Sequence, residues 1–100
     1  MPKVLISDAM DSIAEKILIK SNIEVDVKTD FSVNELIDKI SLYDGLIVRS
    51  ATKVTKEIIE NAKNLKIIGR AGAGVDNIDL VSAKEKNIVV INTPGGNTNA

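Results

Sequence analysis

Two arginines are the residues of this 100-residue chain best suited to bind a small anion. Arg49 and Arg70 are the only arginines among 13 basic residues, and lysines take the other positions. A guanidinium offers a rigid fork for two parallel hydrogen bonds to a carboxylate or phosphate, which a lysine cannot imitate. Each arginine ends a run of branched aliphatic residues, GLIVR and KIIGR. We therefore predict an anion site at the ends of two adjacent strands, unless each arginine pairs with a nearby acid such as Asp8 or Asp76.

A glycine-rich loop, GRAGAGVDN, follows the second of these runs and extends from Gly69 to Asn77. Its glycines can adopt positive φ and bring amide hydrogens close to an anion, or they can serve only a tight turn. The loop does not fit a dinucleotide-binding fingerprint for two reasons. Asn77 stands where a small residue should allow close helix packing, and the loop follows the fourth predicted strand rather than the first strand of a βαβ unit. Ser50 and Thr52 either add hydroxyl donors beside Arg49 or cap the next helix.

Composition and residue types exclude several chemistries. The chain has no histidine and no cysteine, so it lacks the usual proton-transfer side chain, thiolate chemistry and zinc–thiolate sites, and no metal site is predicted. A receiver domain would need an aspartate where Arg49 stands. The net charge of -1 and the 2% aromatic content argue against nucleic acid and membranes as partners, and the short apolar runs favour a cytoplasmic protein. The aspartates near the strand ends are expected in solvated loops or helix caps: Asp8, Asp11, Asp76 and Asp79.

Hydrophobic spacing predicts the elements that position these residues. Short runs rich in valine and isoleucine alternate with segments of helical spacing, which is typical of parallel strands joined by helices. IEVDV alternates apolar and acidic residues and suits an edge strand, whereas the other runs are nearly continuous and suit strands covered on both faces. The five predicted strands are residues 4–7, 23–27, 45–49, 66–70 and 88–92.

Capping residues mark where the helices begin and end. Ser32 and Glu35 form a capping box, and Thr55 precedes a further helix. Asn77 or Asp79 caps a shorter helix. This helix ends near Asn87, because asparagine tolerates the left-handed conformation of a helix stop. Apolar stripes predict the buried faces of the first two helices: Ile13, Ala14, Ile17 and Leu18, then Val33, Leu36, Ile37 and Ile40.

Right-handed crossovers and an edge position for the second strand favour one arrangement. We predict an α/β domain of flavodoxin-like type, a doubly wound sheet of five parallel strands in the order 2-1-3-4-5 with helices on both faces. Such sheets bind ligands at the carboxyl ends of their strands, where both arginines stand. The tail from Asn92 to Ala100 supplies helix-capping residues without a helix, so we expect the polypeptide to continue.

Three motifs taken together resemble one known family. VRSATKVT (48–55), IIGRAGAGVDNIDL (67–80) and INTPGGNT (91–98) are similar in sequence and spacing to the N-terminal part of the D-isomer-specific 2-hydroxyacid dehydrogenases, and the resemblance covers all 100 residues. It implies that residues 1–92 are the N-terminal portion of a substrate-binding (catalytic) domain. Residues 93–100 would be a hinge toward a nucleotide-binding domain.

The resemblance also implies which residues bind ligands. Arg49 would bind the phosphate of the substrate, and backbone amides would hold its carboxylate. Ala73 and Asn97 would lie near the nicotinamide of NAD. The residues expected to contact the substrate are Arg49, Ser50, Arg70, Ala73, Gly74 and Asn97.

The expected substrate is a small phosphorylated 2-hydroxy acid, which a homo-oligomeric full-length enzyme oxidises with NAD. The catalytic histidine, glutamate and arginine of the family lie later in the chain, so no catalytic residue is expected here and the 100 residues alone should be inactive. Two alternatives stay open. One is a family member that acts on glyoxylate, hydroxypyruvate or lactate, and the other is a flavodoxin-like module that binds a small anion without catalysis.

Overall fold

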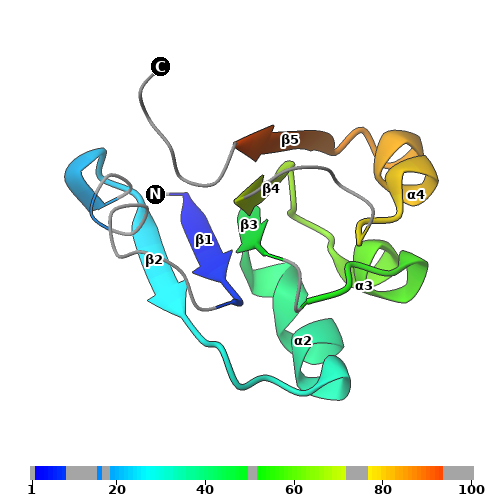
Figure 1. The fold of residues 1–100 in the computed structure, drawn as a ribbon, viewed down its shortest axis with the longest axis horizontal. Helices are drawn as coiled ribbons and strands as arrows, with labels where there is room; N and C mark the ends of the chain where they lie inside the picture. Colours follow the sequence, from blue (N-terminus) through cyan, green and yellow to red (C-terminus); the bar gives the residue numbers. More distant parts are fainter. Residues whose placement is uncertain (1, 9–15, 17–18, 50–51, 72–76, 94–100) are drawn as a thin grey trace.

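The fold is a sheet of five parallel strands with helices packed along it (Figure 1). The computed structural model describes residues 2–8, 16, 19–49, 52–71 and 77–93. The strand order β2-β1-β3-β4-β5 confirms the predicted topology and the edge position of β2. Every strand lies within one residue of its predicted bounds at each end. The strands are β1 (Lys3–Ile6), β2 (Glu24–Val27), β3 (Gly45–Val48), β4 (Ile67–Ala71) and β5 (Val89–Thr93).

The helices begin at the predicted caps. The Ser32 hydroxyl accepts the Glu35 N–H at 3.1 Å and the Glu35 carboxylate accepts the Ser32 N–H at 2.9 Å, which completes the capping box. Thr55 accepts the amide of Ile58, and Asp79 rather than Asn77 caps the last helix. The helices are α2 (Val33–Lys39), the 3-10 helix η1 (Ile40–Leu42), α3 (Lys56–Asn61) and α4 (Leu80–Glu85).

Two details of the helix predictions have different outcomes. Asn87 follows α4 with φ of 58°, which confirms the left-handed stop. Val33 is 62% exposed at the first position of α2, so the buried stripe of that helix begins only at Leu36. The stripe Ile13, Ala14, Ile17 and Leu18 lies outside the described residues, although Lys16, Ile19 and Lys20 beside it are helical. No helix in the described part of the chain has the length and apolar character of a membrane span.

One face of the sheet carries the hydrophobic core. Parallel strands in register place paired residues on the same face, and Leu5 pairs with Leu46, which pairs with Ile68. All three are almost fully buried and belong to one cluster with residues of α2, η1, α3 and α4. These helices lie along one side of the sheet (Figure 1). The core therefore holds the strands and fixes where their carboxyl ends lie.

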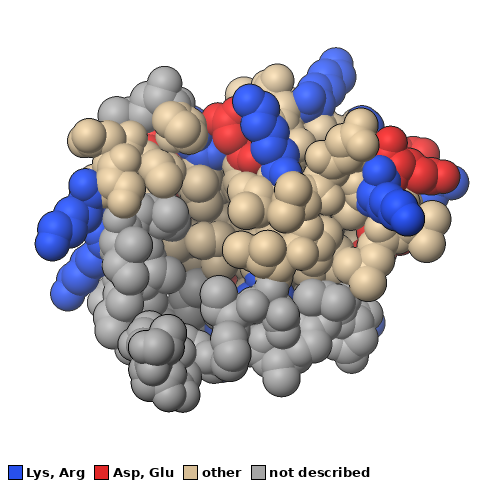
Figure 2. Space-filling view, turned by 90° about the horizontal axis from the view of Figure 1, so that it is seen from above, with Lys and Arg blue, Asp and Glu red and all other residues tan. Residues whose placement is uncertain are grey.

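The opposite face is only partly covered. Val4 and Ile6 of β1 are buried there, but toward β5 the apolar side chains are exposed. Ile67 is 39% exposed, Val89 55% and Ile91 45%. The view from above shows a tan area in the middle without charged side chains, with basic side chains to its left and both basic and acidic side chains above it and to its right (Figure 2). The prediction that β4 and β5 are covered on both faces is therefore wrong for this chain. An apolar run indicates that a strand can be buried, but it does not indicate which segment covers the strand.

Gly45 lies where the sheet leaves no room for a side chain. A Cβ atom at this position would lie 3.1 Å from Cγ2 of Val4 and 3.3 Å from Cγ2 of Ile67, whereas one at Gly69 would meet its nearest neighbours at 3.9 Å. We expect Gly45→Ala to lower the free energy of unfolding by about 1–3 kcal/mol through overpacking. Gly69→Ala should lower the free energy of unfolding by less than about 1 kcal/mol, or should raise it. Urea unfolding of both variants checks this contrast, and equal losses would contradict it.

The amino-terminal end of the sheet is closed by a polar cluster around Tyr43. Its hydroxyl donates to Oδ2 of Asp26 at 2.8 Å, and Nζ of Lys3 lies 3.7 Å from the same oxygen and 5.4 Å from the centre of the tyrosine ring. Burial raises the pKa of Tyr43, and the hydrogen bond to the Asp26 carboxylate raises it further. Tyr43 is 3% exposed. This cluster ties the edge strand β2 to the core and lies at the end of the sheet opposite the arginines.

Candidate functional site

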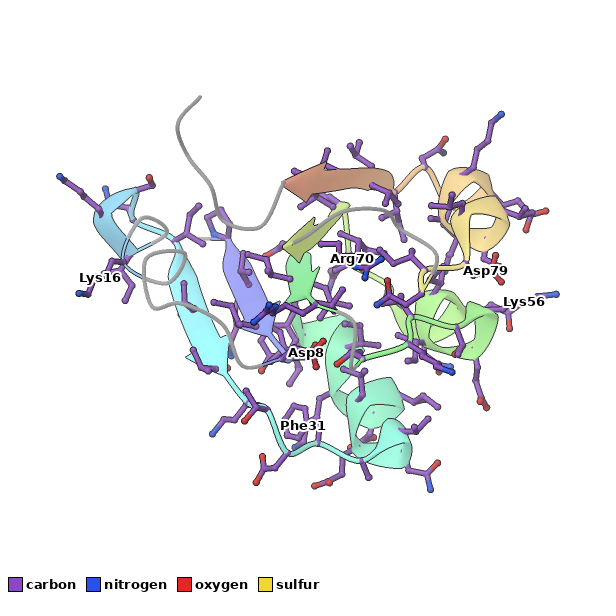
Figure 3. All side chains as sticks on the ribbon, in the orientation of Figure 1. Asp8, Lys16, Phe31, Lys56, Arg70 and Asp79 are labelled. Atoms are coloured by element: carbon purple, nitrogen blue, oxygen red, sulfur yellow. The ribbon has the colours of Figure 1, made fainter. Side chains whose placement is uncertain are left out.

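The carboxyl ends of β1, β3 and β4 bring the predicted anion-binding arginines to one edge of the sheet. Arg49 directly follows β3 and is exposed. Arg70 lies within β4, paired with Val48, so it stands one residue closer to the centre of the sheet than Arg49 and is half-buried. Figure 3 labels Arg70 and Asp8 at this edge. The predicted adjacency of the two arginine-bearing strands is confirmed.

Asp8 is buried, which overturns the expectation of a solvated loop position. Asp8 is the second residue after β1 and is 6% exposed. Its Oδ2 accepts the backbone N–H of Arg49 at 2.7 Å and that of Thr52 at 2.9 Å. Its Oδ1 accepts the Thr52 hydroxyl at 2.5 Å. Three hydrogen bonds to one carboxylate group stabilise an acidic side chain in this largely buried position.

Thr52 has a different role from the two considered for it. Its hydroxyl donates to Asp8 and accepts a hydrogen bond from the Ser7 hydroxyl at 3.1 Å, so its proton is not directed at a ligand. The cap of the following helix is Thr55. Thr52 therefore joins the end of β1 to the loop after β3.

Asn77 connects the loop after β3 to the loop after β4. Its side-chain amide donates to the carbonyl of Arg49 and to the carbonyl of Thr52, both at 2.6 Å. The backbone carbonyl of Asn77 accepts the N–H of Val54 at 2.9 Å, and Val54 forms a parallel bridge with Ile78. The two loops are thus paired beyond the ends of their strands, and the amide of Asn77 takes the place that a small residue has in a dinucleotide-binding loop.

This arrangement decides which groups of the loop can reach a ligand. The backbone N–H groups of Arg49 and Thr52 are bound to Asp8, and their carbonyls are bound to Asn77. The Arg49 side chain is exposed. Among the described residues of this loop, the backbone amides of Arg49 and Thr52 are therefore bound to Asp8, and the exposed Arg49 side chain is the group best placed to meet an anion at this edge. No group of three or more potential metal ligands is found in the described ranges.

The other residues predicted to bind ligands lie outside the described residues. These are Ser50, Ala73, Gly74 and Asn97. The hinge predicted for residues 93–100 is described only at its first position.

Comparison with known proteins decides the family. The model of the D-isomer specific 2-hydroxyacid dehydrogenase catalytic domain matches residues 4–100. The chain belongs to this family. The match covers every strand but the first residue of β1 and includes both loops of the candidate site.

The curated relatives of this chain are much longer than the chain itself. It is 52% identical over 96 residues to D-3-phosphoglycerate dehydrogenase of Archaeoglobus fulgidus, and 51% identical over 96 residues to the human protein of that name. In both comparisons 96% of the chain is covered, and the chain spans 18% of the length of the relative.

Solved structures of the family share the fold. An NAD+-bound 3-phosphoglycerate dehydrogenase of Entamoeba histolytica matches 94% of this chain with a TM-score of 0.82 and 39% identity, and the match covers 33% of that structure. A Pyrococcus horikoshii protein matches 95% of the chain with a TM-score of 0.87 and 39% identity, over 28% of its own length. Escherichia coli D-lactate dehydrogenase, at 17% identity, shares the fold with a TM-score of 0.76.

Sequence reasoning did not assign two residues of the candidate site, Asp8 and Asn77, their roles there. A carboxylate immediately after a continuous apolar strand, on the edge where ligands bind, was a usable signal for Asp8. The role of Asn77 had no comparable signal, because its two hydrogen-bond acceptors are carbonyls 25 and 28 residues away in the chain.

Proposed function

We propose that this chain is the substrate-binding portion of an NAD-dependent D-3-phosphoglycerate dehydrogenase. The full-length enzyme would oxidise 3-phospho-D-glycerate to 3-phosphooxypyruvate in serine biosynthesis. The observation that carries the proposal is an exposed arginine held at the carboxyl end of β3 in a chain 52% identical to an enzyme of that name. The motifs VRSATKVT and RAGAGVDN resemble those of phosphoglycerate dehydrogenases in particular.

In this proposal the residues of the chain bind and orient the substrate. Arg49 binds the phosphate through its guanidinium fork, and Arg70 contributes positive charge from the adjacent strand. Ser50 and the amides of Ala73 and Gly74 complete the contacts to the substrate. The carbon that carries the hydroxyl group is thereby held for hydride loss, while the hydroxyl proton passes to a base later in the polypeptide.

NAD+ would supply the hydride acceptor. Ala73 and Asn97 are the residues assigned to the nicotinamide side of the cofactor. The pyrophosphate would bind elsewhere, because Asn77 stands where a dinucleotide-binding loop needs a small residue and its side chain bridges the carbonyls of Arg49 and Thr52. The 100 residues alone would therefore bind NAD poorly and would not turn over substrate.

The domain organisation is part of the same proposal. Residues 1–92 would form most of the substrate-binding domain, and residues 93–100 the hinge to a nucleotide-binding domain. The exposed apolar side chains of Ile67, Val89 and Ile91 support this, since a parallel sheet is normally covered on both faces and a later segment of a longer polypeptide would cover them. The full-length enzyme would be a cytoplasmic homo-oligomer without nucleic-acid or membrane partners.

Turnover by the full-length protein tests the proposed reaction. NADH formation is followed with 3-phospho-D-glycerate, D-glycerate and D-lactate. We expect kcat/KM for the phosphorylated substrate to exceed that for D-glycerate by about 30-fold or more, since a charge-assisted contact to phosphate contributes about 2 kcal/mol. Equal or faster turnover of D-lactate would instead support another member of the family. Tight binding of phosphate or 3-phospho-D-glycerate without any turnover would favour the anion-binding module.

A further inference from the structure

We propose that Asp8 and Asn77 are positioning residues that hold Arg49 in the conformation that binds the anionic group of the substrate. This inference rests on the proposed function and adds two residues that do not themselves contact the substrate. We refer to Asp8, Arg49, Thr52 and Asn77 as the bridging cluster.

The bridging cluster holds the loop after β3 at both of its ends. Arg49 and Thr52 each donate a backbone N–H to Asp8, and each accepts a hydrogen bond from Asn77 at its carbonyl. Four polar backbone groups are thus bound by two side chains from other parts of the sheet. These contacts satisfy the backbone groups of Arg49 and Thr52 that a strand or helix would otherwise satisfy.

The chemistry of each side chain matches its partners. Asp8 has only acceptors, and it receives two N–H groups and one O–H group. Asn77 faces two carbonyls, which require a donor, so the orientation of its amide is determined by its surroundings. An aspartate at position 77 would have the same shape and would place an acceptor against both carbonyls. Position 8 therefore requires an acceptor and position 77 a donor, and exchanging them would break the hydrogen bonds at both positions.

Because Asp8 is an acidic residue, a positioning role and a purely electrostatic role predict different effects of removing it. A carboxylate within hydrogen-bonding distance of the Arg49 backbone repels an anion bound at that residue. If Asp8 acted only through its charge, its removal would strengthen binding of an anionic substrate. If Asp8 acts by positioning Arg49, its removal weakens binding instead, and the two roles predict changes of opposite sign.

Equilibrium binding of 3-phospho-D-glycerate to the full-length protein tests the inference. We expect Asp8→Ala and Asn77→Asp each to raise Kd by about 10- to 100-fold, because a misplacement of about 1 Å costs up to about 100-fold in a preorganised site. Thr52→Val removes one hydroxyl contact and should raise Kd by less than about fivefold. Asp79→Ala is the matched control, since it also removes a carboxylate that accepts a backbone amide but lies at the start of α4, and it should leave Kd unchanged.

A double-mutant cycle distinguishes positioning from a general loss of structure. In an Arg49→Ala background, Asp8→Ala should have a much smaller effect on Kd than in the wild-type protein, because the main contact that it positions is gone. An unchanged or lower Kd for Asp8→Ala alone, or equal effects of Asp8→Ala in both backgrounds, would overturn the inference.

Hydrogen exchange separates failure of this inference from failure of the proposed function. The amides of Arg49 and Thr52 should be protected in the wild-type protein and should lose that protection in Asp8→Ala. If the wild-type protein does not bind 3-phospho-D-glycerate, the proposed function fails, whatever the exchange result. If it binds and the two amides exchange equally fast in the wild type and the variant, the positioning role alone is wrong.

Discussion

Arg49→Ala is expected to weaken binding of 3-phospho-D-glycerate by about 30- to 150-fold, with little change in the binding of D-glycerate. A charged hydrogen-bonding side chain that contacts phosphate in an exposed site contributes about 2–3 kcal/mol, and each 1.4 kcal/mol is about tenfold in Kd. Arg49 is the expected contact because the residue is exposed at the edge of the sheet while its backbone N–H and carbonyl are bound within the bridging cluster. Isothermal titration calorimetry of the full-length protein measures both ligands.

Two further variants separate the shape of the guanidinium from its charge. Arg49→Lys keeps the charge and loses the fork, so we expect a loss of about five- to tenfold. Lys53→Ala removes a neighbouring exposed charge that has no assigned contact, and it should change Kd by less than about twofold at physiological salt. If Lys53→Ala and Arg49→Ala had equal effects, the site would be a diffuse basic surface and the specific assignment to Arg49 would be wrong.

Ile68→Ala is expected to lower the free energy of unfolding by about 2–5 kcal/mol. Ile68 is 0% exposed, lies in the central part of β4 and packs within the cluster that joins the sheet to α2, α3 and α4. Truncation to alanine removes three carbon atoms from this cluster and leaves a cavity that the surrounding strands cannot fill. Domains have a total stability of about 5–15 kcal/mol, so the variant would lose much of the folded population on mild heating.

The adjacent residue in the same strand gives a matched control. Ile67 is the same residue type but points to the opposite face, where it is 39% exposed. We expect Ile67→Ala to cost less than about 1.5 kcal/mol in this chain, because its side chain already contacts water. Urea unfolding of both variants, followed by circular dichroism, measures the difference. Similar losses at both positions would contradict the assignment of one covered and one open face.

Local patterns in the sequence determined the elements of this protein. The apolar runs predicted all five strands, and the alternation in IEVDV predicted the edge position of β2. The Ser32–Glu35 capping box and the left-handed Asn87 were also predicted from the sequence. Each depends only on residues within a few positions of one another. The strand order followed from the handedness of crossovers, which allows few arrangements of five parallel strands.

The candidate site was predictable only in part. The two arginines stood out because they are rare in this chain and end two strands, and strand ends meet at one edge of a parallel sheet. The exposed face formed by β4 and β5 was not predictable, because an apolar run indicates that a strand can be buried and not what covers it.

Only the tertiary structure decided how the loops at that edge are held. Asp8 binds groups 41 and 44 residues away in the chain, and Asn77 binds groups 25 and 28 residues away. Whether a carboxylate after one strand meets the amides after another depends on the register of β1 against β3, which no short pattern contains. Strands and caps are therefore encoded by neighbours in sequence, whereas the bridging cluster exists because the sheet brings distant polar groups within about 3 Å of one another, the distance at which hydrogen bonds form.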